Sequence, residues 1–264
     1  MSRGISIAFA VLVLISIIPF PGSSAADGKK KGVKYYKAEV IGSYPHDASA
    51  YTQGLFFDNG ILYESSGQYG ESSFRRVDLN TGATLLRIDP DPGIFAEGSV
   101  SMDGLVYLLS WREQVCLVYD IETFNLLSSF SYYGEGWGLT TDGESLIMSD
   151  GSSTLVYRDP MTFVERRRVN VTFEGKPVPY LNELEYIDGK IWANVYGLDY
   201  IIIIDGESGV VEGRIDCRDL LEKKYRGKGE DVLNGIAYNP VDGSVYLTGK
   251  YWPRMYKVRL NDVK

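Results

Sequence analysis

Five copies of one short pattern, spaced roughly 40 to 50 residues apart, run through most of this 264-residue chain. Each copy opens with a polar or aromatic residue, in four cases followed by glycine, and continues into two apolar segments commonly separated by an Asp-Gly or Asn-Gly turn. The copies begin at Gln53, Glu97, Trp137, Asn182 and Asn234. Because this spacing matches the length of a four-stranded blade, the repeats predict an all-β fold, a five-bladed β-propeller.

The last copy is incomplete, and this predicts how the ring closes. Alternating apolar residues and glycine-containing turns indicate short antiparallel strands in every copy. The last copy has only three such segments and ends near Leu260. We therefore expect the alternating segment 36–41, upstream of the first copy, to supply the missing outer strand. Residues 219–224 could form one short helical turn, and no longer amphipathic pattern is present.

The first residues have the features of a secretory signal peptide. Arg3 precedes a mostly apolar run over residues 5–20, and the small residues of 21–26 follow as a cleavage site. An uncleaved membrane anchor is the alternative, but a run of about 16 residues is short for a span. We predict a secreted or lumenal protein with three parts: a signal peptide (1–26), a segment with the ring-closing strand (27–43) and a catalytic propeller (44–264).

Two features depend on that compartment. Asn170 opens the sequence Asn-Val-Thr, which is an acceptor for N-glycosylation. Cys116 and Cys217 either form one disulfide or remain free, and the apolar run around Cys116 suits a buried thiol equally well. The sequence leaves both the glycan and the disulfide open.

Composition excludes several classes of function. The 27 basic and 35 acidic side chains give a net charge of −8, which disfavours nucleic acid as a partner. His46 is the one histidine, so a Ser-His-Asp triad or a histidine-rich zinc site would have to use it. The sequence also lacks a glycine-rich phosphate loop. Carboxylates, amides, ammonium groups and indoles remain for chemistry.

Equivalent positions of the five copies would face one another across the channel of a propeller. The opening residues of the copies differ in type and include one carboxylate, Glu97, whereas a purely structural ring would repeat one residue. A second set lies where the second strand of each copy ends. Its divergent members, which we expect to carry function, are Trp111, Asp150, Tyr196 and Lys250. Its recurring members, which we expect to bond backbone groups, are Ser65, Ser110, Ser149 and Thr248.

These segments resemble the plant and bacterial type of glutaminyl cyclase, in order and in spacing, from about Tyr44 to Leu260. The matching segments are 51–55, 64–70, 135–140, 181–185, 233–238 and 248–253. The resemblance implies a five-bladed propeller and a glutaminyl-peptide cyclotransferase, an acyltransferase that converts an N-terminal glutamine of peptides and proteins to pyroglutamate and releases ammonia. It implies no catalytic zinc and no required cofactor, with a structural calcium ion in the channel as a further family feature. A monomer is the default.

The resemblance also implies roles for single residues. Glu97 matches the general base that later acts as acid, and its aromatic neighbours Phe95 and Trp111 are expected to raise its pKa. The positions that orient the substrate and stabilise an oxyanion match Gln53, Asn182 and Lys250. The pocket walls match Tyr51, Phe95, Trp111, Trp137 and Tyr196. If Glu97 is not the base, Glu135 and Glu183 are the next candidates.

The sequence departs from the family pattern at several positions. Tyr51 stands where the family usually has phenylalanine, Tyr196 where it has tryptophan, and Ser99-Val100 follow the catalytic Glu-Gly. Two other functions stay open because a propeller alone does not establish chemistry. One is a calcium-dependent lactonase or hydrolase, which the single carboxylate of the first ring disfavours. The other is a non-catalytic propeller that binds peptides or glycans with its aromatic face.

Overall fold

The computed structural model describes residues 32–263, so the predicted signal peptide lies outside the described part of the chain. Within residues 32–263 the fold is all-β, with 22 strands and one helical element, the 3-10 turn Lys223–Tyr225. The predicted helical turn over 219–224 overlaps it only at Lys223 and Lys224. No helix in this part of the chain is long and apolar enough to cross a membrane.

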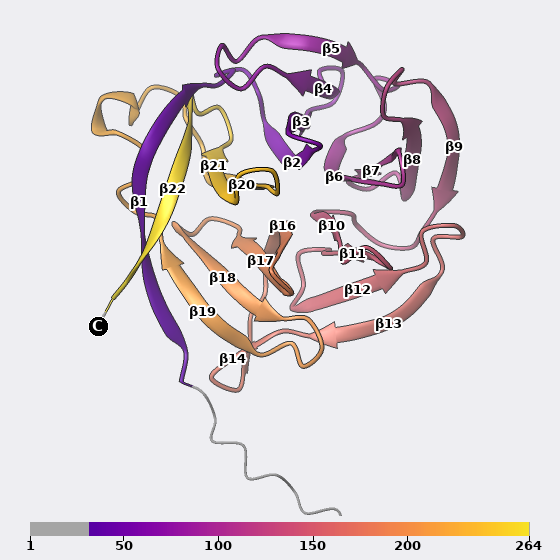
Figure 1. The fold of residues 1–264 in the computed structure, drawn as a ribbon. Helices are drawn as coiled ribbons and strands as arrows, with labels where there is room; N and C mark the ends of the chain where they lie inside the picture. The colour runs from indigo at the N-terminus through magenta and orange to yellow at the C-terminus, as the bar shows by residue number, and fades with distance from the viewer. Residues whose placement is uncertain (1–31, 264) are drawn as a thin grey trace, which may run out of the picture. The chain divides into compact units, whose positions relative to one another are not determined.

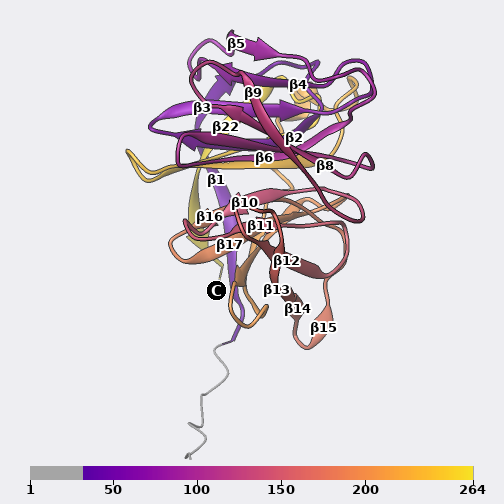
Figure 2. The ribbon, with the colours of Figure 1, turned by 90° about the vertical axis from the view of Figure 1, so that its right-hand side faces the viewer.

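Three four-stranded sheets follow one another along the chain, and each keeps its strands in chain order with antiparallel neighbours. The first contains β2 (Thr52–Asp58), β3 (Ile61–Ser66), β4 (Ser73–Val77) and β5 (Thr84–Ile88). The second contains β6 (Ala96–Met102), β7 (Leu105–Ser110), β8 (Val115–Asp120) and β9 (Leu126–Ser131). The third contains β10 (Leu139–Thr141), β11 (Leu146–Met148), β12 (Thr154–Arg158) and β13 (Glu165–Asn170). A small hairpin, β14 (Thr172–Phe173) and β15 (Lys176–Pro177), follows and projects from the sheets (Figure 2).

The remaining strands form one eight-stranded sheet that consists of two four-stranded groups. One group is β16 (Leu181–Ile187), β17 (Lys190–Val195), β18 (Tyr200–Asp205) and β19 (Val211–Asp216). The other is β20 (Leu233–Asn239), β21 (Ser244–Gly249), β22 (Arg254–Asp262) and, from the start of the described chain, β1 (Lys34–Pro45). The strand predicted over residues 36–41 is therefore present, and β1 pairs antiparallel with β22 as expected.

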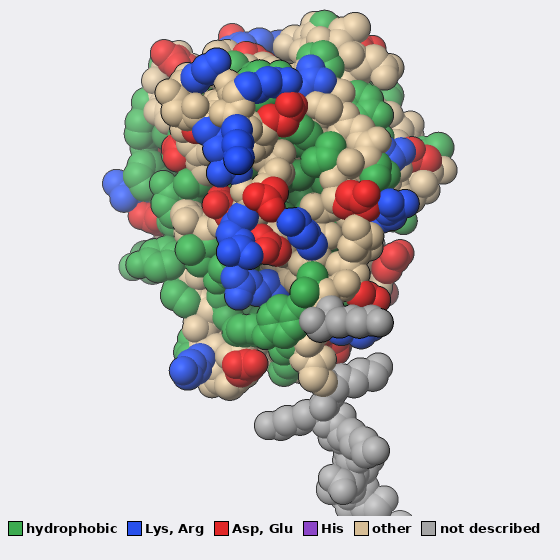
Figure 3. Space-filling view, turned by 90° about the vertical axis from the view of Figure 1, so that its left-hand side faces the viewer, with side chains coloured by type: hydrophobic (Ala, Val, Ile, Leu, Met, Phe, Trp, Pro, Cys, Tyr) green, Lys and Arg blue, Asp and Glu red, His purple; other side chains and the backbone are tan. Residues whose placement is uncertain are grey.

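Strand β1 also has a second partner that the sequence did not predict. Its first residues, Lys34 to Lys37, pair in parallel with Gly213 to Asp216 of β19, along the edge of β1 opposite to the one that pairs with β22. This pairing joins the last two groups into one sheet. Basic and acidic side chains are interspersed on the face over β1 and β22 (Figure 3), where Arg259 pairs with Glu39 and Lys37 with Asp219.

The five four-stranded groups are arranged around a common centre, with the first strand of each group nearest to it (Figure 1). Neighbouring first strands are in contact with one another, in the circular order β2, β6, β10, β16, β20. Five apolar clusters fill the spaces between neighbouring groups. The one between the first two sheets contains the stacked rings of Phe56, Tyr63 and Phe74. Burial of these faces holds each group against the next.

The two cysteines lie in different apolar clusters and are unpaired. Cys116 is on β8, between the second and third sheets, and Cys217 follows β19. Of the two alternatives left open for Cys116, the buried thiol is therefore the one found.

Candidate active site

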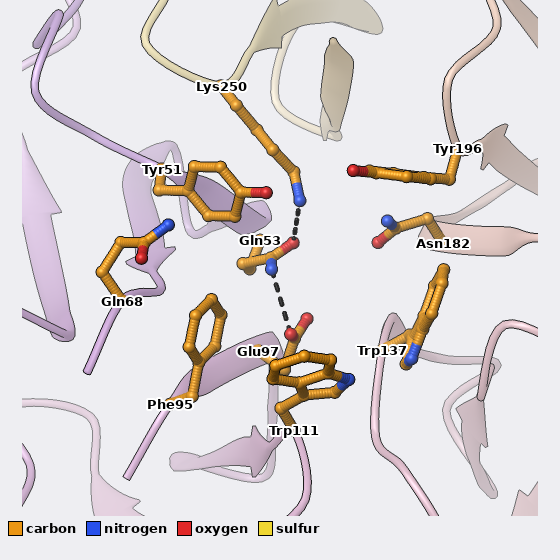
Figure 4. A pocket seen from close by; sticks show the side chains of 10 residues that line it. All are labelled: Tyr51, Gln53, Gln68, Phe95, Glu97, Trp111, Trp137, Asn182, Tyr196 and Lys250. Atoms are coloured by element: carbon orange, nitrogen blue, oxygen red, sulfur yellow. Dashed lines mark hydrogen bonds between the residues drawn. The ribbon is translucent and has the colours of Figure 1, made fainter. Parts of the chain in front are cut away.

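A pocket of about 260 Å³ brings together nine side chains that the sequence placed in a site (Figure 4). They are Tyr51, Gln53, Phe95, Glu97, Trp111, Trp137, Asn182, Tyr196 and Lys250, and the tenth lining residue is Gln68. Asp150 does not line it, and its carboxylate accepts the Ser152 N–H in a local turn. Residues from all five four-stranded groups thus converge on one cavity at the centre.

Small residues beside the site allow the first strands to approach closely. A Cβ atom on Gly98 would lie 2.5 Å from the backbone nitrogen of Leu139, and one on Gly138 would lie 2.0 Å from the carbonyl oxygen of Asn182. Both distances are shorter than any ordinary van der Waals contact. The glycine that follows Glu97 or Trp137 therefore lets the next first strand come near enough for the pocket residues to meet.

The recurring hydroxyl residues bond backbone groups, as predicted. Ser65 Oγ donates to the Glu97 carbonyl at 2.6 Å, and Ser149 Oγ donates to the Asn182 carbonyl at 2.7 Å. Thr248 Oγ1 donates to the Arg254 carbonyl, and Ser110 Oγ accepts the Val115 N–H. Two of these hydroxyls hold the backbone at pocket residues, so they contribute to the site indirectly.

A short chain of hydrogen bonds crosses the pocket floor. Lys250 Nζ donates to Gln53 Oε1 at 2.7 Å, and Gln53 Nε2 donates to Glu97 Oε1 at 3.0 Å (Figure 4). Asn234, the opening residue of the last copy, donates to Gln53 Oε1 at 3.4 Å and to the Thr52 carbonyl. The Gln53 carboxamide therefore stands between the ammonium and the carboxyl group and keeps them from forming a direct ion pair.

The two ionisable groups at the ends of these hydrogen bonds, Glu97 and Lys250, have pKa values that are shifted in the direction of the neutral form. Burial raises the pKa of the Glu97 carboxyl well above its ordinary value, Glu135 and Glu113 add to the shift, and Lys250 opposes it. Burial likewise lowers the pKa of Lys250 to about 8, against the effect of Glu97 and Asp231. The direction for Glu97 agrees with the prediction made from its aromatic neighbours. Proton exchange near neutral pH is the chemistry that such shifts favour.

Aromatic rings enclose the pocket on most sides. Phe95 lies 5.4 Å from Trp111 and 6.1 Å from Tyr51 between ring centroids, and Trp137 lies 5.9 Å from Tyr196. Lys250 Nζ lies 4.1 Å from the centroid of Tyr51 and 5.4 Å from that of Tyr196. The rings reduce access of water and stabilise the ammonium group through their faces.

Asn182 presents an open acceptor at the pocket. Its side-chain oxygen is buried and has no hydrogen-bond partner among the described residues. Nearly all buried polar atoms of folded proteins are bonded, so an unpaired oxygen that lines a cavity indicates a position for a ligand donor.

The chain also matches known proteins in sequence and in fold. A protein-family model described as glutamine cyclotransferase matches residues 12–260. The chain belongs to the glutamine cyclotransferase family. A glutaminyl-peptide cyclotransferase of Arabidopsis thaliana is 37% identical over 258 residues, which cover 94% of this chain and 79% of the relative. The crystal structure of Myxococcus xanthus glutaminyl cyclase matches with a TM-score of 0.83 and 35% identity, over 88% of this chain and all of the other.

In this glutamine cyclotransferase, the two alternative carboxylates do not line the pocket. Glu183 is buried and accepts backbone N–H groups from Ile236 at 2.9 Å and Leu55 at 3.4 Å. It thereby ties three first strands together, which accounts for its place where the other copies have glycine. Glu135 lies near the pocket and accepts from the indoles of Trp111 and Trp137. Neither is as well placed as Glu97 to transfer a proton in the pocket.

His46 is also outside the pocket lining of this family member. Its Nε2 lies 2.9 Å from Glu64 Oε1, and Arg75 bonds both Glu64 and Asp47. This buried network, which we call the His46 network, has its polar groups directed at one another. The histidine is therefore part of the scaffold.

Sequence reasoning missed Gln68. It lies in the loop between β3 and β4 with a φ of 117°, a conformation that is rare outside glycine. The residue falls inside the matching segment 64–70, but only the loop conformation turns its side chain to the pocket. No periodic signal reveals such a position.

Proposed function

We propose that this protein is a glutaminyl-peptide cyclotransferase that forms pyroglutamate from the N-terminal glutamine of peptides and proteins and releases ammonia. The observation that carries the proposal is the chain Lys250–Gln53–Glu97 within one pocket lined by aromatic residues. Membership in the glutamine cyclotransferase family supports it. In this reaction an acyl group passes from one nitrogen to another, so the enzyme is an acyltransferase of the aminoacyl type.

Glu97 is the proton carrier in the proposed reaction. The substrate α-amine attacks the γ-carboxamide carbon of the same residue, so a C–N bond forms and the amine loses a proton to Glu97. The tetrahedral intermediate then collapses, the original C–N bond breaks, and Glu97 returns the proton to the departing nitrogen as ammonia. A raised pKa suits both steps, since the carboxyl group must accept and release a proton near neutrality.

Lys250, Gln53 and Asn182 stabilise the intermediate and orient the substrate. The γ-carbonyl oxygen becomes negatively charged in the intermediate, and a preplaced ammonium group in a water-poor pocket is effective against such a charge. Gln53 holds Lys250 and Glu97 on its two ends, and the open Asn182 oxygen accepts an N–H of the substrate amine or carboxamide. The aromatic walls favour a folded glutamine side chain with the reacting atoms close together.

We propose that the fold is a five-bladed β-propeller closed by an N-terminal strand. Support comes from the five four-stranded groups, the circular contacts of their first strands and the pairing of β1 with β22. In such a fold the starts of the first strands of all blades lie at the same end of the central channel, so the residues there can form one ligand site.

We also propose that the protein enters the secretory pathway as a monomer and carries a glycan at Asn170. The apolar N-terminal segment of the sequence supports the first part. Asn170 is exposed at the end of β13, and its side-chain oxygen accepts from Thr154, which leaves the amide nitrogen at the surface. Asn170 does not line the pocket, so a glycan there is compatible with activity.

The calcium ion implied by the family resemblance stays a prediction. Among residues 32–263, no three His, Cys, Asp or Glu side chains come together as a metal cage. Both oxygens of Glu183 already accept backbone N–H groups. The described carboxylates therefore do not fit a calcium site by themselves, and we assign no step of the reaction to a metal or other cofactor.

Ammonia release from a Gln-initiated dipeptide tests the proposal. We expect activity in the presence of a chelator, and Glu97→Gln should reduce kcat by about 10²–10⁴-fold, the usual effect of a general acid-base group. Binding of the dipeptide should survive in that variant. Equal activity of both proteins would remove Glu97 from the mechanism, and loss of parental activity in chelator would favour a metal-dependent enzyme. Binding without turnover in either protein would favour the non-catalytic propeller.

A further inference from the structure

Glu135 connects two walls of the pocket through a single atom. Its Oε2 accepts the indole N–H of Trp111 at 2.8 Å and that of Trp137 at 3.0 Å. Trp111 follows β7 of the second sheet and Trp137 precedes β10 of the third, so the carboxylate spans two neighbouring groups. Figure 4 shows the two indole nitrogens on the same side of the pocket, pointing toward one region.

We propose that Glu135 is a positioning residue, which fixes both indoles and so sets the shape of the slot that receives the substrate glutamine. This inference rests on the proposed cyclotransferase function, since it assigns Trp111 and Trp137 to the substrate walls. It gives Glu135 no part in proton transfer.

The second carboxylate oxygen of Glu135 binds Arg112. Glu135 Oε1 accepts from Arg112 Nε at 3.0 Å, and the Arg112 guanidinium lies 3.7 Å from the centroid of the Trp111 ring. Trp111 is therefore held at its N–H by Glu135 and on one face by Arg112. These contacts matter because Trp111 and Trp137 are only partly buried, so packing alone does not restrict their rotamers.

The ionised form of Glu135 suits this role. Although partial burial would raise its pKa, the Trp137 and Trp111 N–H groups and Arg112 outweigh burial and lower it. A carboxylate oxygen can accept from two N–H donors at once, and its charge strengthens both bonds. A glutamine keeps one oxygen that can accept from both indoles but loses the charge and the acceptor for Arg112, whereas alanine removes all three.

The backbone around Glu135 is fixed without the help of its side chain. Gly136 N donates to the Trp111 carbonyl at 2.9 Å, and Trp137 N donates to the Ser149 carbonyl at 3.0 Å. A Cβ atom on Gly136 would lie 2.6 Å from the Ser110 carbonyl oxygen, so glycine is needed for this close approach. Truncation of Glu135 should therefore free the indoles and leave the chain path in place.

Glu113 provides a matched control. It is another carboxylate near Glu97, and like Glu135 it raises the Glu97 pKa through its charge. Its oxygens accept from Tyr69 Oη at 2.8 Å and from the Phe95 N–H at 3.3 Å, and from neither indole. Glu113→Gln therefore removes a comparable charge without releasing a tryptophan.

The experiment compares Glu135→Ala, Glu135→Gln and Glu113→Gln with the full parental chain, using a Gln-initiated dipeptide as probe. For Glu135→Ala we expect KM to rise about tenfold and kcat to fall about threefold, since loose walls weaken binding more than proton transfer. Glu135→Gln should recover most of the KM, and Glu113→Gln should keep the parental KM. Tryptophan emission should shift to longer wavelength only in Glu135→Ala, because the remaining two of the four tryptophans, Trp192 and Trp252, are buried elsewhere.

Three results would overturn the proposal. The first is an unchanged KM and emission spectrum in folded Glu135→Ala. The second is a rise of KM in Glu113→Gln equal to that in Glu135→Gln, which would assign the effect to charge. The third applies if Glu135→Ala does not fold: it is a KM of Glu135→Gln that differs from the parental KM by more than about tenfold. If the parent has no turnover, the proposed function fails, and dipeptide titration followed by tryptophan emission still tests whether Glu135 shapes the pocket.

Discussion

Two buried carboxylates, Glu64 and Glu97, differ in what surrounds them. Glu64 in the His46 network accepts from Thr52 Oγ1 at 2.7 Å and Arg75 at 2.7 Å, and lies 2.9 Å from His46 Nε2. Among the described side chains, Glu97 in the pocket has one hydrogen-bond partner, the Gln53 amide at 3.0 Å. Thr52 and Gln53 are adjacent on β2, so consecutive residues of one strand serve the two carboxylates.

The pKa shifts follow from the number and charge of the partners. Burial alone would raise the pKa of Glu64, but His46 and Arg75 outweigh burial and hold it at about 2. For His46, burial would lower the pKa and Glu64 raises it instead. For Glu97 burial dominates and the pKa is raised. A buried charge with matching partners stabilises a scaffold, whereas one with few partners remains available for a substrate.

The largest expected effect is a difference in protein stability between variants of Glu64 and variants of Glu97. Glu64→Gln leaves His46 buried without its anion and Arg75 with Asp47 as its remaining anionic partner, so it should lower the free energy of unfolding by about 3–5 kcal/mol. Glu97→Gln replaces a carboxyl group that has one hydrogen-bond partner, the Gln53 amide, by an amide of the same shape and should change stability by less than about 1 kcal/mol. Chemical denaturation of both variants measures the difference. Equal destabilisation would show that the two carboxylates have the same structural role.

Replacement of Lys250, the cation of the pocket, should reduce activity without reducing stability, whereas Glu64→Gln should reduce stability. Lys250→Met should reduce kcat by about 10²–10³-fold, the usual loss for one group that stabilises an oxyanion. Its stability should equal or exceed that of the parent because a buried ammonium group is replaced by an apolar chain. Ammonia release and thermal unfolding of the same samples provide both values. A destabilised but active Lys250→Met would place Lys250 in the scaffold instead.

The pKa of Lys250 predicts the alkaline limb of the rate profile. Burial lowers it to about 8, with Glu97 and Asp231 acting in the opposite direction. If the ammonium form is required, kcat/KM should fall about tenfold per pH unit above this value. At Lys250 the folded protein binds fewer protons than the unfolded chain between about pH 8 and 10.5, so the contribution of this residue to stability should rise across that window. Lys250→Arg keeps the positive charge at higher pH, so the alkaline fall of kcat/KM should move to higher pH. If the fall does not move, the titration belongs to another group.

The smallest expected effect concerns Tyr196, where the family usually has tryptophan. The centroid of the Tyr196 ring lies 5.4 Å from Lys250 Nζ, and tryptophan offers a cation the best of the aromatic faces, in an interaction of about 0.5–1 kcal/mol at exposed sites. Tyr196→Trp should therefore lower KM about two- to fivefold with little change in kcat. Steady-state kinetics with Gln-initiated dipeptides that differ in the second residue provides the measurement. A large fall in kcat would mean that the phenol has a specific role.

The repeats were sufficient to predict the four-stranded groups and seven of the ten pocket residues, and the family resemblance added Tyr51 and Phe95. Period and alternation are local properties of a sequence, and equivalent positions of repeated units meet for reasons of symmetry. The sequence placed Lys250, Gln53 and Glu97 in one site but did not predict the hydrogen bonds between them, because hydrogen-bond partners depend on rotamers that no periodicity encodes. The same holds for Gln68, whose direction depends on an uncommon φ, and for the contact of Glu135 with two indoles.

The His46 network shows a further limit of sequence reasoning. His46, Glu64 and Arg75 stand in three separate segments, and nothing in their spacing indicates that they meet. The parallel pairing of β1 with β19 was missed for a related reason, because it joins two four-stranded groups along an edge that the repeats do not specify. Long-range pairs outside the repeated frame are therefore the part of this fold that required a structure.

The pairing of β1 with β22 has a consequence for the order in which the molecule can assemble. Glu39 and Arg259 face each other in register across these strands although 220 residues separate them. On the ribosome β1 is made long before its antiparallel partner, so this edge stays open until the residues of β22 emerge. Contacts between such distant segments slow folding. β22 therefore completes the sheet, and removal of a few residues of β22 should cost far more structure than those residues alone.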